Sequence, residues 1–317
     1  MKPALAVVGS LNMDFVVSVD RLPAPGETVL GRDFRTIPGG KGANQACAAG
    51  RLSAGRVDVR MAGRVGYDVF ADHLKASLSA AGVDTSAVCA TRSQPTGVAL
   101  IWVDSAGQNS IVVASGANLA LAAADVEAMR RVFRGASHAL FQLESPLDTV
   151  AAALALAREE GLVTVLDPAP ARALAPALLS NVDILTPNES EALVLLGRPA
   201  ARVTLDQAPE LARALLAMGP RAVVLKLGDR GCFYADADQR IHVPAFAVEA
   251  RDATAAGDAF NGALAVALTE GRGIEAGLRF ACAAAAISVT RPGAQSSIPT
   301  RAETESFLAE RSAAAGL

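Results

Sequence analysis

Cysteine and histidine are scarce in this 317-residue chain, which has four of the first and three of the second. The cysteines are Cys47, Cys89, Cys232 and Cys282. Because they lie far apart and form no Cys-x-x-Cys pair, they argue against a zinc site and against a disulfide framework. The histidines show no metal-ligand spacing either. This cysteine usage predicts a protein of a reducing compartment.

An excess of one charge is also lacking. The chain has 29 basic and 32 acidic residues, and its net charge of −3 indicates neither a nucleic-acid partner nor a disordered acidic tail. The first apolar run, Ala4 to Val8, ends in Gly-Ser and is too short for a signal peptide or a membrane span. With 51% hydrophobic residues, the chain is expected to be a cytoplasmic globular protein with a large core.

An alternation of apolar strands and helices is present in the second half of the chain. Strands are predicted at 163–166, 183–185 and 222–225, with a helix at 171–179 between the first two. Such alternation indicates a parallel sheet with helices on both faces. Further helices are predicted at 69–81, 123–133 and 274–289.

Two pairs of β-like segments interrupt this alternation in the first half. The segments are 15–19, 28–30, 98–103 and 110–113. They predict a small β-sheet, built from about residues 12–38 and 95–115 and inserted in one α/β domain that spans 1–317. A flap of this kind could close over a substrate and exclude water. An edge extension of the main sheet would give the same pattern.

The stretch Asp252-Ala-Thr-Ala-Ala-Gly-Asp258 places two carboxylates around small residues and leads into a helical apolar pattern. Ala255, Ala256 and Gly257 fall at the first turn of that helix, where free N–H groups and the helix dipole attract anions. Asp258 is then placed to take a proton from a hydroxyl that attacks a phosphoryl group. An Asp that only complements the dipole is the plainer alternative.

Two polar stretches near the N-terminus also point to ligand binding. Asn12 and Asp14 follow the first strand, and their spacing of two puts both on one face of an extended segment, within reach of vicinal hydroxyls. Gly39-Gly-Lys-Gly-Ala-Asn-Gln45 precedes a helix but is not a phosphate-binding P-loop, because Lys41 is followed by Gly42. A glycine turn before a helix, or a turn at Asn-x-Asp, would explain each stretch without a ligand.

The stretches 39–45 and 252–258 resemble the two signatures of the PfkB-type carbohydrate kinases, the ribokinase family. Glu144 after the strand at 139–141 and the pair Asn188-x-x-Glu191 match the same family, and the resemblance extends over nearly the whole chain. It implies a ribokinase-like three-layer α/β fold, with a mostly parallel central sheet flanked by helices and a small β-sheet lid. It also implies an ATP-dependent kinase, with D-ribose, phosphorylated at O5, as the expected acceptor.

The resemblance implies a role for each matching residue. Asp258 would be the general base, and Ala255, Ala256 and Gly257 would form an anion hole. The residues expected to bind the sugar are Asn12, Asp14, Gly40, Lys41, Asn44, Glu144 and Asp258. The residues expected to bind ATP are Asn188, Lys226, Gly228, Gly231, Gly257 and Cys282, the last against adenine.

Two metal ions and a homodimer also follow from the resemblance. Mg²⁺ would be held through water by Asn188 and Glu191, although a helix cap explains the same spacing. A potassium ion would be held, mostly by backbone carbonyls, at Asp252, Thr254, Ser288, Arg291, Gly293 and Ser297. Subunits would pair through the lid, and neither nucleic acid nor membrane is an expected partner.

Lys226 departs from the Thr that ribokinases usually have at this position. Lys-x-Gly occurs in related sugar kinases, so ATP binding stays expected while the case for ribose weakens. Deoxyribose, fructose, adenosine and 2-keto-3-deoxygluconate remain alternative acceptors. A sugar-binding regulator without catalysis would lack the base or the anion hole. A dinucleotide-binding oxidoreductase would need Gly-x-Gly-x-x-Gly after the first strand, where Gly9-Ser-Leu-Asn12 stands.

Overall fold

The computed structural model describes residues 2–106, 108–128, 130–199 and 201–314. Its centre is a nine-stranded sheet in the order β13-β12-β11-β10-β9-β8-β1-β4-β5. The strands from β5 to β11 are parallel, and β12 and β13 add an antiparallel edge. The strands are β1 Ala4–Val8, β4 Asp58–Gly66, β5 Val83–Thr91, β8 Ala136–Phe141, β9 Val163–Leu166, β10 Ile184–Leu185, β11 Ala222–Lys226, β12 Cys232–Ala235 and β13 Arg240–Val243.

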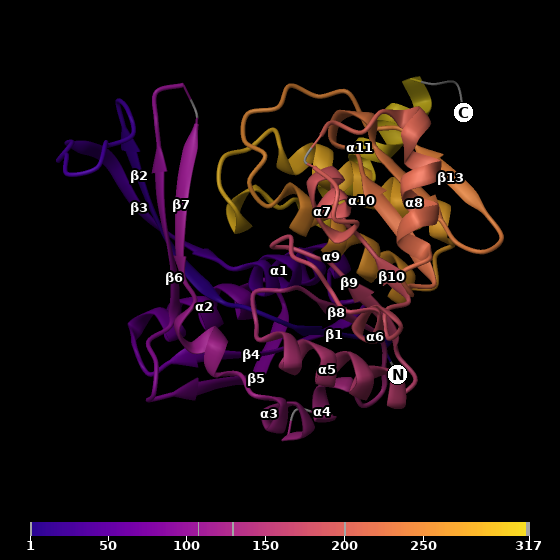
Figure 1. The fold of residues 1–317 in the computed structure, drawn as a ribbon, viewed down its shortest axis with the longest axis horizontal. Coiled ribbons are helices and arrows are strands. Elements are labelled where there is room, and N and C mark those ends of the chain that lie inside the picture. The colour runs from indigo at the N-terminus through magenta and orange to yellow at the C-terminus, as the bar shows by residue number, and fades with distance from the viewer. Residues whose placement is uncertain (1, 107, 129, 200, 315–317) are drawn as a thin grey trace.

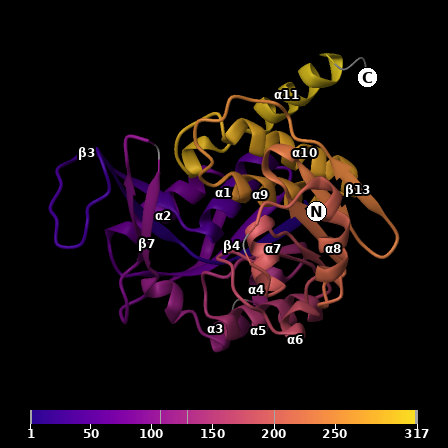
Figure 2. The same ribbon diagram turned by 45° about the horizontal axis from the view of Figure 1, so that its top comes forward.

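Helices cover both faces of this sheet (Figure 1). One face packs on α1 Lys41–Ser53, α2 Val69–Ala80, α9 Ala256–Thr269 and α10 Ile274–Ser288. The C-terminal helix α11 Arg301–Ala314 lies on the outer side of this layer (Figure 2). The other face packs on α3 Ala123–Ala128, α4 Arg130–Phe133, α5 Leu147–Glu159, α6 Pro176–Leu179, α7 Glu189–Leu195 and α8 Ala208–Leu216.

Alternate residues of the strands supply the two cores. Leu5 and Val7 of β1 are buried among the helices of the first face, and Ala6 and Val8 among those of the second. This alternation follows from the period of two in a strand. The predicted parallel sheet between two layers of helices is therefore confirmed. Within the described residues, no helix combines the length and the apolar character that a membrane span needs.

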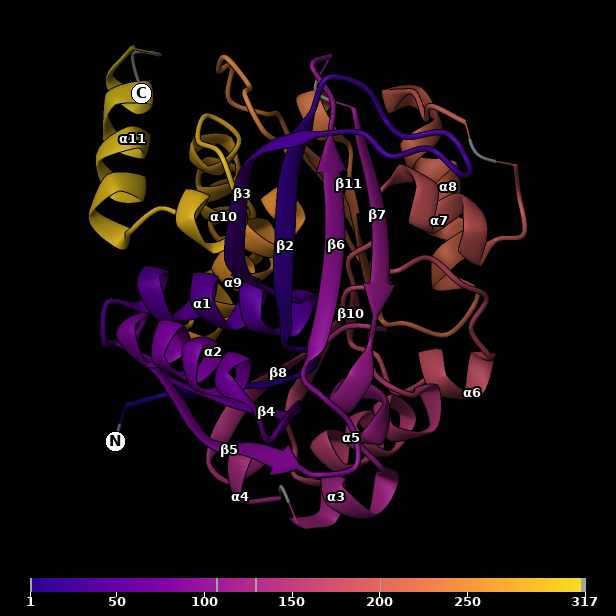
Figure 3. The same cartoon turned by 90° about the vertical axis from the view of Figure 1, so that its left-hand side faces the viewer.

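A second, four-stranded sheet stands to one side of the three layers (Figure 1), and Figure 3 shows it face on. Its order is β3-β2-β6-β7, formed by β2 Asn12–Val19, β3 Gly31–Gly39, β6 Gly97–Val103 and β7 Asn109–Ala114. Two antiparallel hairpins meet in a parallel pairing of β2 with β6. The predicted small sheet is thus present, and it brings two distant parts of the chain together.

Two predicted elements differ from the structure. The segment 28–30 is not a strand: the chain turns just before it, where the Glu27 N–H bonds to the Ala24 carbonyl, and β3 begins only at Gly31. The predicted helix at 171–179 is reduced to α6, because Ala175 is extended (ψ 141°) before Pro176. A proline disfavours helical backbone in the residue that precedes it.

Candidate active site

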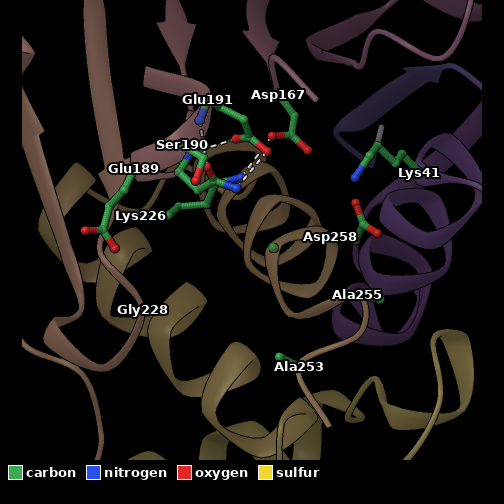
Figure 4. A pocket seen from close by; sticks show the side chains of 12 residues that line it. Lys41, Asp167, Glu189, Ser190, Glu191, Lys226, Gly228, Ala253, Ala255 and Asp258 are labelled. Carbon is green, nitrogen blue, oxygen red and sulfur yellow. Dashed lines mark hydrogen bonds and ion pairs between the residues drawn. The ribbon is translucent and has the colours of Figure 1, made fainter. Parts of the chain in front are cut away.

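A cavity of about 450 Å³ opens at the carboxyl ends of the parallel strands (Figure 4). Asp167 follows β9 directly and Lys226 ends β11, and most of the other wall residues lie at or near the starts of α1, α7 and α9. The lining residues are Lys41, Asp167, Asn188, Glu189, Ser190, Glu191, Lys226, Gly228, Ala253, Ala255, Gly257 and Asp258. This edge is where open α/β sheets bind their ligands, since the loops there converge.

The first turn of α9 forms one wall of the cavity. The helix begins at Ala256, and its N-cap, Ala255, has left-handed backbone torsions (φ 57°) and no side-chain cap. Such torsions cost a non-glycine residue about 1–2 kcal/mol, a strain typical of functional sites. The Ala256 N–H donates to the Ala253 carbonyl at 3.2 Å. The Gly257 N–H, which can have no partner within the helix, is therefore the more available anion donor of the two.

Asp258 is buried in this turn and held by two amides of α1. Asn44 Nδ2 donates to its Oδ2 at 3.0 Å, and Gln45 Nε2 donates to its Oδ1 at 2.9 Å. Burial raises the pKa of Asp258, the nearby Lys41 ammonium opposes that rise, and the Asp167 carboxylate adds to it. The hydrogen bonds that the carboxylate accepts from the two amides favour its charged form and partly oppose the rise in its pKa.

Close packing of α9 on α1 makes these contacts. A Cβ atom on Gly262, one turn after Asp258, would lie 2.5 Å from Ala48 Cβ and 2.7 Å from the Gln45 carbonyl oxygen. Only a residue without a side chain fits at this crossing. Gly262 therefore lets the two helices approach closely enough for Gln45 and Asp258 to bond.

Asp167 is a site residue that we did not predict from the sequence. This buried residue follows β9 directly, where its Oδ1 accepts from Lys226 Nζ and its Oδ2 from Gln45 Nε2, at 2.9 and 2.8 Å. The signal was present, because Asp167 stands one residue past a predicted strand, as Glu144 stands three residues past another. Nothing in the local sequence says which partners such a side chain reaches.

The residues predicted to bind the sugar gather on the side of the cavity near the second sheet. Asn12, at the start of β2, is buried, and its Oδ1 accepts from Asn118 Nδ2 at 2.7 Å. Glu144 Oε2 accepts from the backbone N–H of Lys41 at 3.0 Å. Gly40 has a φ of 87°, and a Cβ there would lie 2.7 Å from the Asn12 backbone nitrogen. The glycine thus lets the signature loop reach the end of the first strand.

Two charges on this side are strongly perturbed. Burial, followed by the Glu144 and Asp258 carboxylates, raises the pKa of Asp14 to about 7. Burial acts against the charge of Lys41, but the carboxylates of Asp258, Asp167, Glu144 and Glu191 more than offset it and raise its pKa. Lys41 therefore stays charged, and its side chain points toward Asp258 (Figure 4). Lys41 is only partly exposed to solvent.

Residues 2–301 match the pfkB family carbohydrate kinases. The chain belongs to this family. It is 42% identical over 308 residues to a ribokinase of Haemophilus influenzae, covering 97% of this chain and 99% of that one. It is 40% identical over 304 residues to a ribokinase of Bacillus subtilis, covering 96% and 99%. The predicted family and the enzyme class, an ATP-dependent carbohydrate kinase, are confirmed.

Solved structures agree with this assignment. The fold is similar to that of Thermotoga maritima ribokinase, with a TM-score of 0.87 and 38% identity over 97% of this chain and 99% of that one. It is equally similar to Arabidopsis thaliana ribokinase in complex with ribose and ATP, with a TM-score of 0.88 and 34% identity over the same shares. The predicted ribokinase-like fold is confirmed.

The Asn-x-x-Glu pair of this carbohydrate kinase forms a helix cap. Asn188 Oδ1 accepts from the Glu191 N–H at 2.8 Å, and the Glu191 carboxylate accepts from Asn188 N and Nδ2 at 2.7 and 2.8 Å. The pair therefore forms the helix cap that the sequence offered as an alternative to a magnesium site. Both residues also line the cavity. Burial raises the pKa of Glu191, and Lys226 opposes that rise. Among the described residues, no three His, Cys, Asp or Glu side chains converge as metal ligands.

The segments predicted to hold potassium lie side by side. The Asp252 carboxylate accepts from the N–H groups of Thr254 and Gly293, both at 2.8 Å. The buried hydroxyl oxygens of Ser288 and Ser297 are 2.8 Å apart. The sixth residue, Arg291, directs its guanidinium at Glu303 of α11, so it has only its backbone carbonyl to offer.

Some of the residues predicted to bind ATP line the main cavity, whereas Gly231 and Cys282 do not. Gly228, in a left-handed conformation, lines the cavity beside Lys226. Gly231 serves the chain turn instead, because a Cβ there would lie 2.0 Å from the Val243 carbonyl oxygen. Cys282 of α10 is buried, with its sulfur 3.7 Å from that of Cys232, and it is not among the lining residues of the main cavity.

A second cavity, of about 340 Å³, lies next to the segment that Gly231 contacts. Its lining residues are Val243, Pro244, Ala245, Phe246, Ala247, Arg279 and Arg311. Arg279 precedes Cys282 by three residues on α10, which puts the two on one face of that helix. Arg279 and Phe246 could not be identified from the sequence, since neither belongs to a signature.

Proposed function

We propose that this carbohydrate kinase transfers the γ-phosphoryl group of ATP to O5 of D-ribose, giving D-ribose 5-phosphate and ADP. The observation that carries the proposal is the place of Asp258: a buried carboxylate in the first turn of α9, next to the Gly257 N–H at the start of the helix. Polar sugar-side residues lie on one side of it and two lysines line the same cavity. The ribokinases that match the chain over nearly its full length support ribose as the acceptor.

On the sugar side, the side-chain oxygens of Asn12, Asp14 and Glu144 accept hydrogen bonds from the hydroxyl groups of ribose. Gly40 and Asn44 lie next to the sugar ring. O5 then points toward Asp258. As O5 attacks the γ-phosphorus, its proton passes to the Asp258 carboxylate, the O5–P bond forms, and the bond from the γ-phosphorus to ADP breaks. Lys41 balances the charge of the ionised base before the transfer.

On the phosphate side, the Gly257 N–H and the N-terminal dipole of α9 stabilise the transferring phosphoryl group. The Ala256 N–H also bonds the phosphoryl group once its hydrogen bond to the Ala253 carbonyl is broken. Lys226 contributes a second positive charge, since its Nζ lies 3.5 Å from the place of a Cβ on Gly257. The ATP ribose and base then pass Gly228 and enter the second cavity, where Phe246 and Arg279 offer an aromatic face and a planar cation.

The donor sets fit the two metal ions that the family implies. Glu191 has a buried carboxylate next to the amide of Asn188, and these hard oxygens suit a hydrated Mg²⁺, which neutralises phosphate charge when bound. The carboxylate of Asp252, the hydroxyls of Ser288 and Ser297, and nearby carbonyls suit K⁺, whose charge would favour an anion at Gly257. Thr254 and Gly293 hold the Asp252 carboxylate in place.

The second sheet acts as the lid of one catalytic domain, with its segments at about 12–38 and 95–115. It carries exposed apolar side chains on β3, β6 and β7, namely Phe34, Leu100, Ile111, Val112 and Val113. A patch of this kind on a projecting sheet favours pairing with a second copy, which gives a homodimer through the lid. The four free cysteines are in keeping with a reducing cytoplasm.

Ribose affinity is expected to depend on pH through Asp14. Because its pKa is about 7, Asp14 is mostly protonated at pH 6 and mostly ionised at pH 8. The ionised form can accept hydrogen bonds from ribose hydroxyls at both oxygens, whereas the protonated form carries its own proton on one of them. The KM for ribose should therefore rise about fivefold between pH 8 and pH 6, the worth of about one hydrogen bond. Steady-state kinetics of Asp14→Asn should give a high KM that is flat across this range; a KM that still varies would assign the effect to another group.

The stability of the fold depends on the protonation of Asp14 in the opposite direction from ribose affinity. A raised pKa means that the folded state holds the proton more tightly than the unfolded state. The contribution of Asp14 to stability is present below its unfolded pKa and is lost as the pH rises through about 7. Sugar binding and folding thus favour different protonation states of one residue.

Phosphorus NMR of the product tests the proposed reaction. With ATP, Mg²⁺ and ribose, the product resonance should couple to the two protons on C5 of the sugar. Coupling to the C1 proton instead would place the phosphate on the anomeric oxygen and contradict the assigned pose. No phosphorylated sugar under these conditions would remove ribose as the acceptor.

A further inference from the structure

Gln45 bridges two carboxylates that the reaction scheme treats separately. Its side chain is fully buried, and its Nε2 donates to Asp258 Oδ1 at 2.9 Å and to Asp167 Oδ2 at 2.8 Å. An amide nitrogen carries two protons, so one group can serve both acceptors. The two buried carboxylates are thus joined by a neutral donor.

The orientation of this amide is fixed by a neighbour. Gln142 Nε2, on the residue after β8, donates to Gln45 Oε1 at 2.6 Å. The carbonyl end of Gln45 therefore faces Gln142, and its NH₂ end faces Asp167 and Asp258. The reverse orientation would set an amide oxygen against two carboxylates and two amide nitrogens against each other.

The bridge continues to the phosphate side of the cavity. Asp167 uses its second oxygen to accept from Lys226 Nζ at 2.9 Å, and that ammonium lies beside Gly257. Hydrogen bonds therefore run without a break from the base, through Gln45 and Asp167, to the lysine beside the anion hole. Their donors lie on α1 and β11, which are far apart in sequence.

We propose that Gln45 is a positioning residue for phosphoryl transfer: by bonding Asp258 and Asp167 together, it keeps the base ionised and aimed at the sugar hydroxyl. The inference rests on the proposed role of Asp258 as the base. Two buried carboxylates without such a donor would compete for one proton, as carboxylate pairs in close contact do. With the bridge, each keeps a charge-assisted hydrogen bond.

The charges around Asp258 make it sensitive to this bridge. The titratable groups that face it or its immediate neighbours are Asp14, Lys41, Glu144, Asp167, Glu191 and Lys226. Four of these six are acidic. Burial already raises the pKa of Asp258, and the loss of one donor would raise it further.

Two variants at this position test the proposal. Gln45→Met keeps the length of the side chain and removes both donors, and Gln45→Glu adds a third carboxyl group between the other two. Each should lower kcat at pH 7 about tenfold or more, move the acidic limb of the kcat profile up by about one pH unit, and change the KM for ribose less than about threefold. The control is Thr164→Val, which removes buried hydrogen bonds to Asn181 and Asp183 at the opposite end of β9.

A carboxyl ¹³C NMR titration gives a readout that needs no turnover. With the Asp258 signal assigned by its loss in Asp258→Asn, its apparent pKa should rise in both Gln45 variants and stay unchanged in Thr164→Val. An unchanged titration and an unchanged acidic limb in both variants would overturn the proposal, as would an equal loss of kcat in the control. If the wild-type protein phosphorylates no sugar, the proposed function fails, while the titration still decides whether Gln45 sets the protonation of Asp258.

Discussion

Replacing Asp258 by Asn is expected to lower kcat about 10²–10⁴-fold, the usual worth of a general base, and to leave the KM for ribose nearly unchanged. Asn has the same shape and still offers an oxygen to one of the two amides, Asn44 or Gln45, that hold this position in the folded protein. What it lacks is a site for the O5 proton. Coupled ADP-release kinetics at saturating ribose and ATP measure the loss.

The matched control is Asp148→Asn. Asp148 also lies in the first turn of a helix, α5, and accepts from the Thr149 N–H, but it does not line the cavity. Its replacement should keep turnover within about twofold, because a surface change in a helix dipole is worth less than 1 kcal/mol. Near-normal turnover in Asp258→Asn would remove Asp258 from its role as the base.

The second large effect is expected at the ion pair of Lys226 with Asp167. The two side chains are only 13% and 3% exposed, so Lys226→Met leaves a buried carboxylate without its cation. Removing one partner of a buried pair costs about 3–5 kcal/mol of stability. We expect a loss of this size in the free energy of unfolding, measured by urea denaturation, together with a lower kcat.

A second change should restore the stability but not the activity. In Lys226→Met combined with Asp167→Asn, the uncompensated charge is gone, and most of the free energy of unfolding should return. As a control, Arg202→Met breaks an exposed pair with Asp229, whose side chains are 72% and 77% exposed, and should cost less than about 1 kcal/mol. A double variant as unstable as Lys226→Met alone would show that the lysine stabilises the fold through packing rather than through its charge.

The parts of the fold set by local pattern could be predicted from the sequence. The strand at Val163–Leu166 has the predicted bounds, and the start of α9 falls at the residues expected from the small run before Asp258. The two wrong predictions, the strand at 28–30 and the helix at 171–179, both lie next to prolines that change the backbone direction. Pro176 ended the extended segment before α6, and the turn after Pro25 delayed β3 to Gly31.

The contacts inside the site could not be predicted in the same way. Gln45 meets Asp167 and Asp258 across 122 and 213 residues of sequence. The crossing of α1 and α9 brings it to Asp258, and the packing of α1 against the end of β9 brings it to Asp167. Asp167 carries the signal of a residue just past a strand, but a parallel sheet ends many strands at that edge. Which of these residues face one another depends on strand order, and no local pattern contains that order.

Coupled ADP release with a panel of sugars tests the proposed ribose kinase activity most directly. The panel is D-ribose, 2-deoxyribose, fructose, adenosine and 2-keto-3-deoxygluconate, each with Mg²⁺ and with either potassium or sodium. The account predicts turnover with ribose well above that with the other acceptors, and a higher rate in potassium than in sodium. Preference for another acceptor would contradict ribose while keeping the kinase family and Asp258, and no turnover with any acceptor would contradict the proposed catalysis itself.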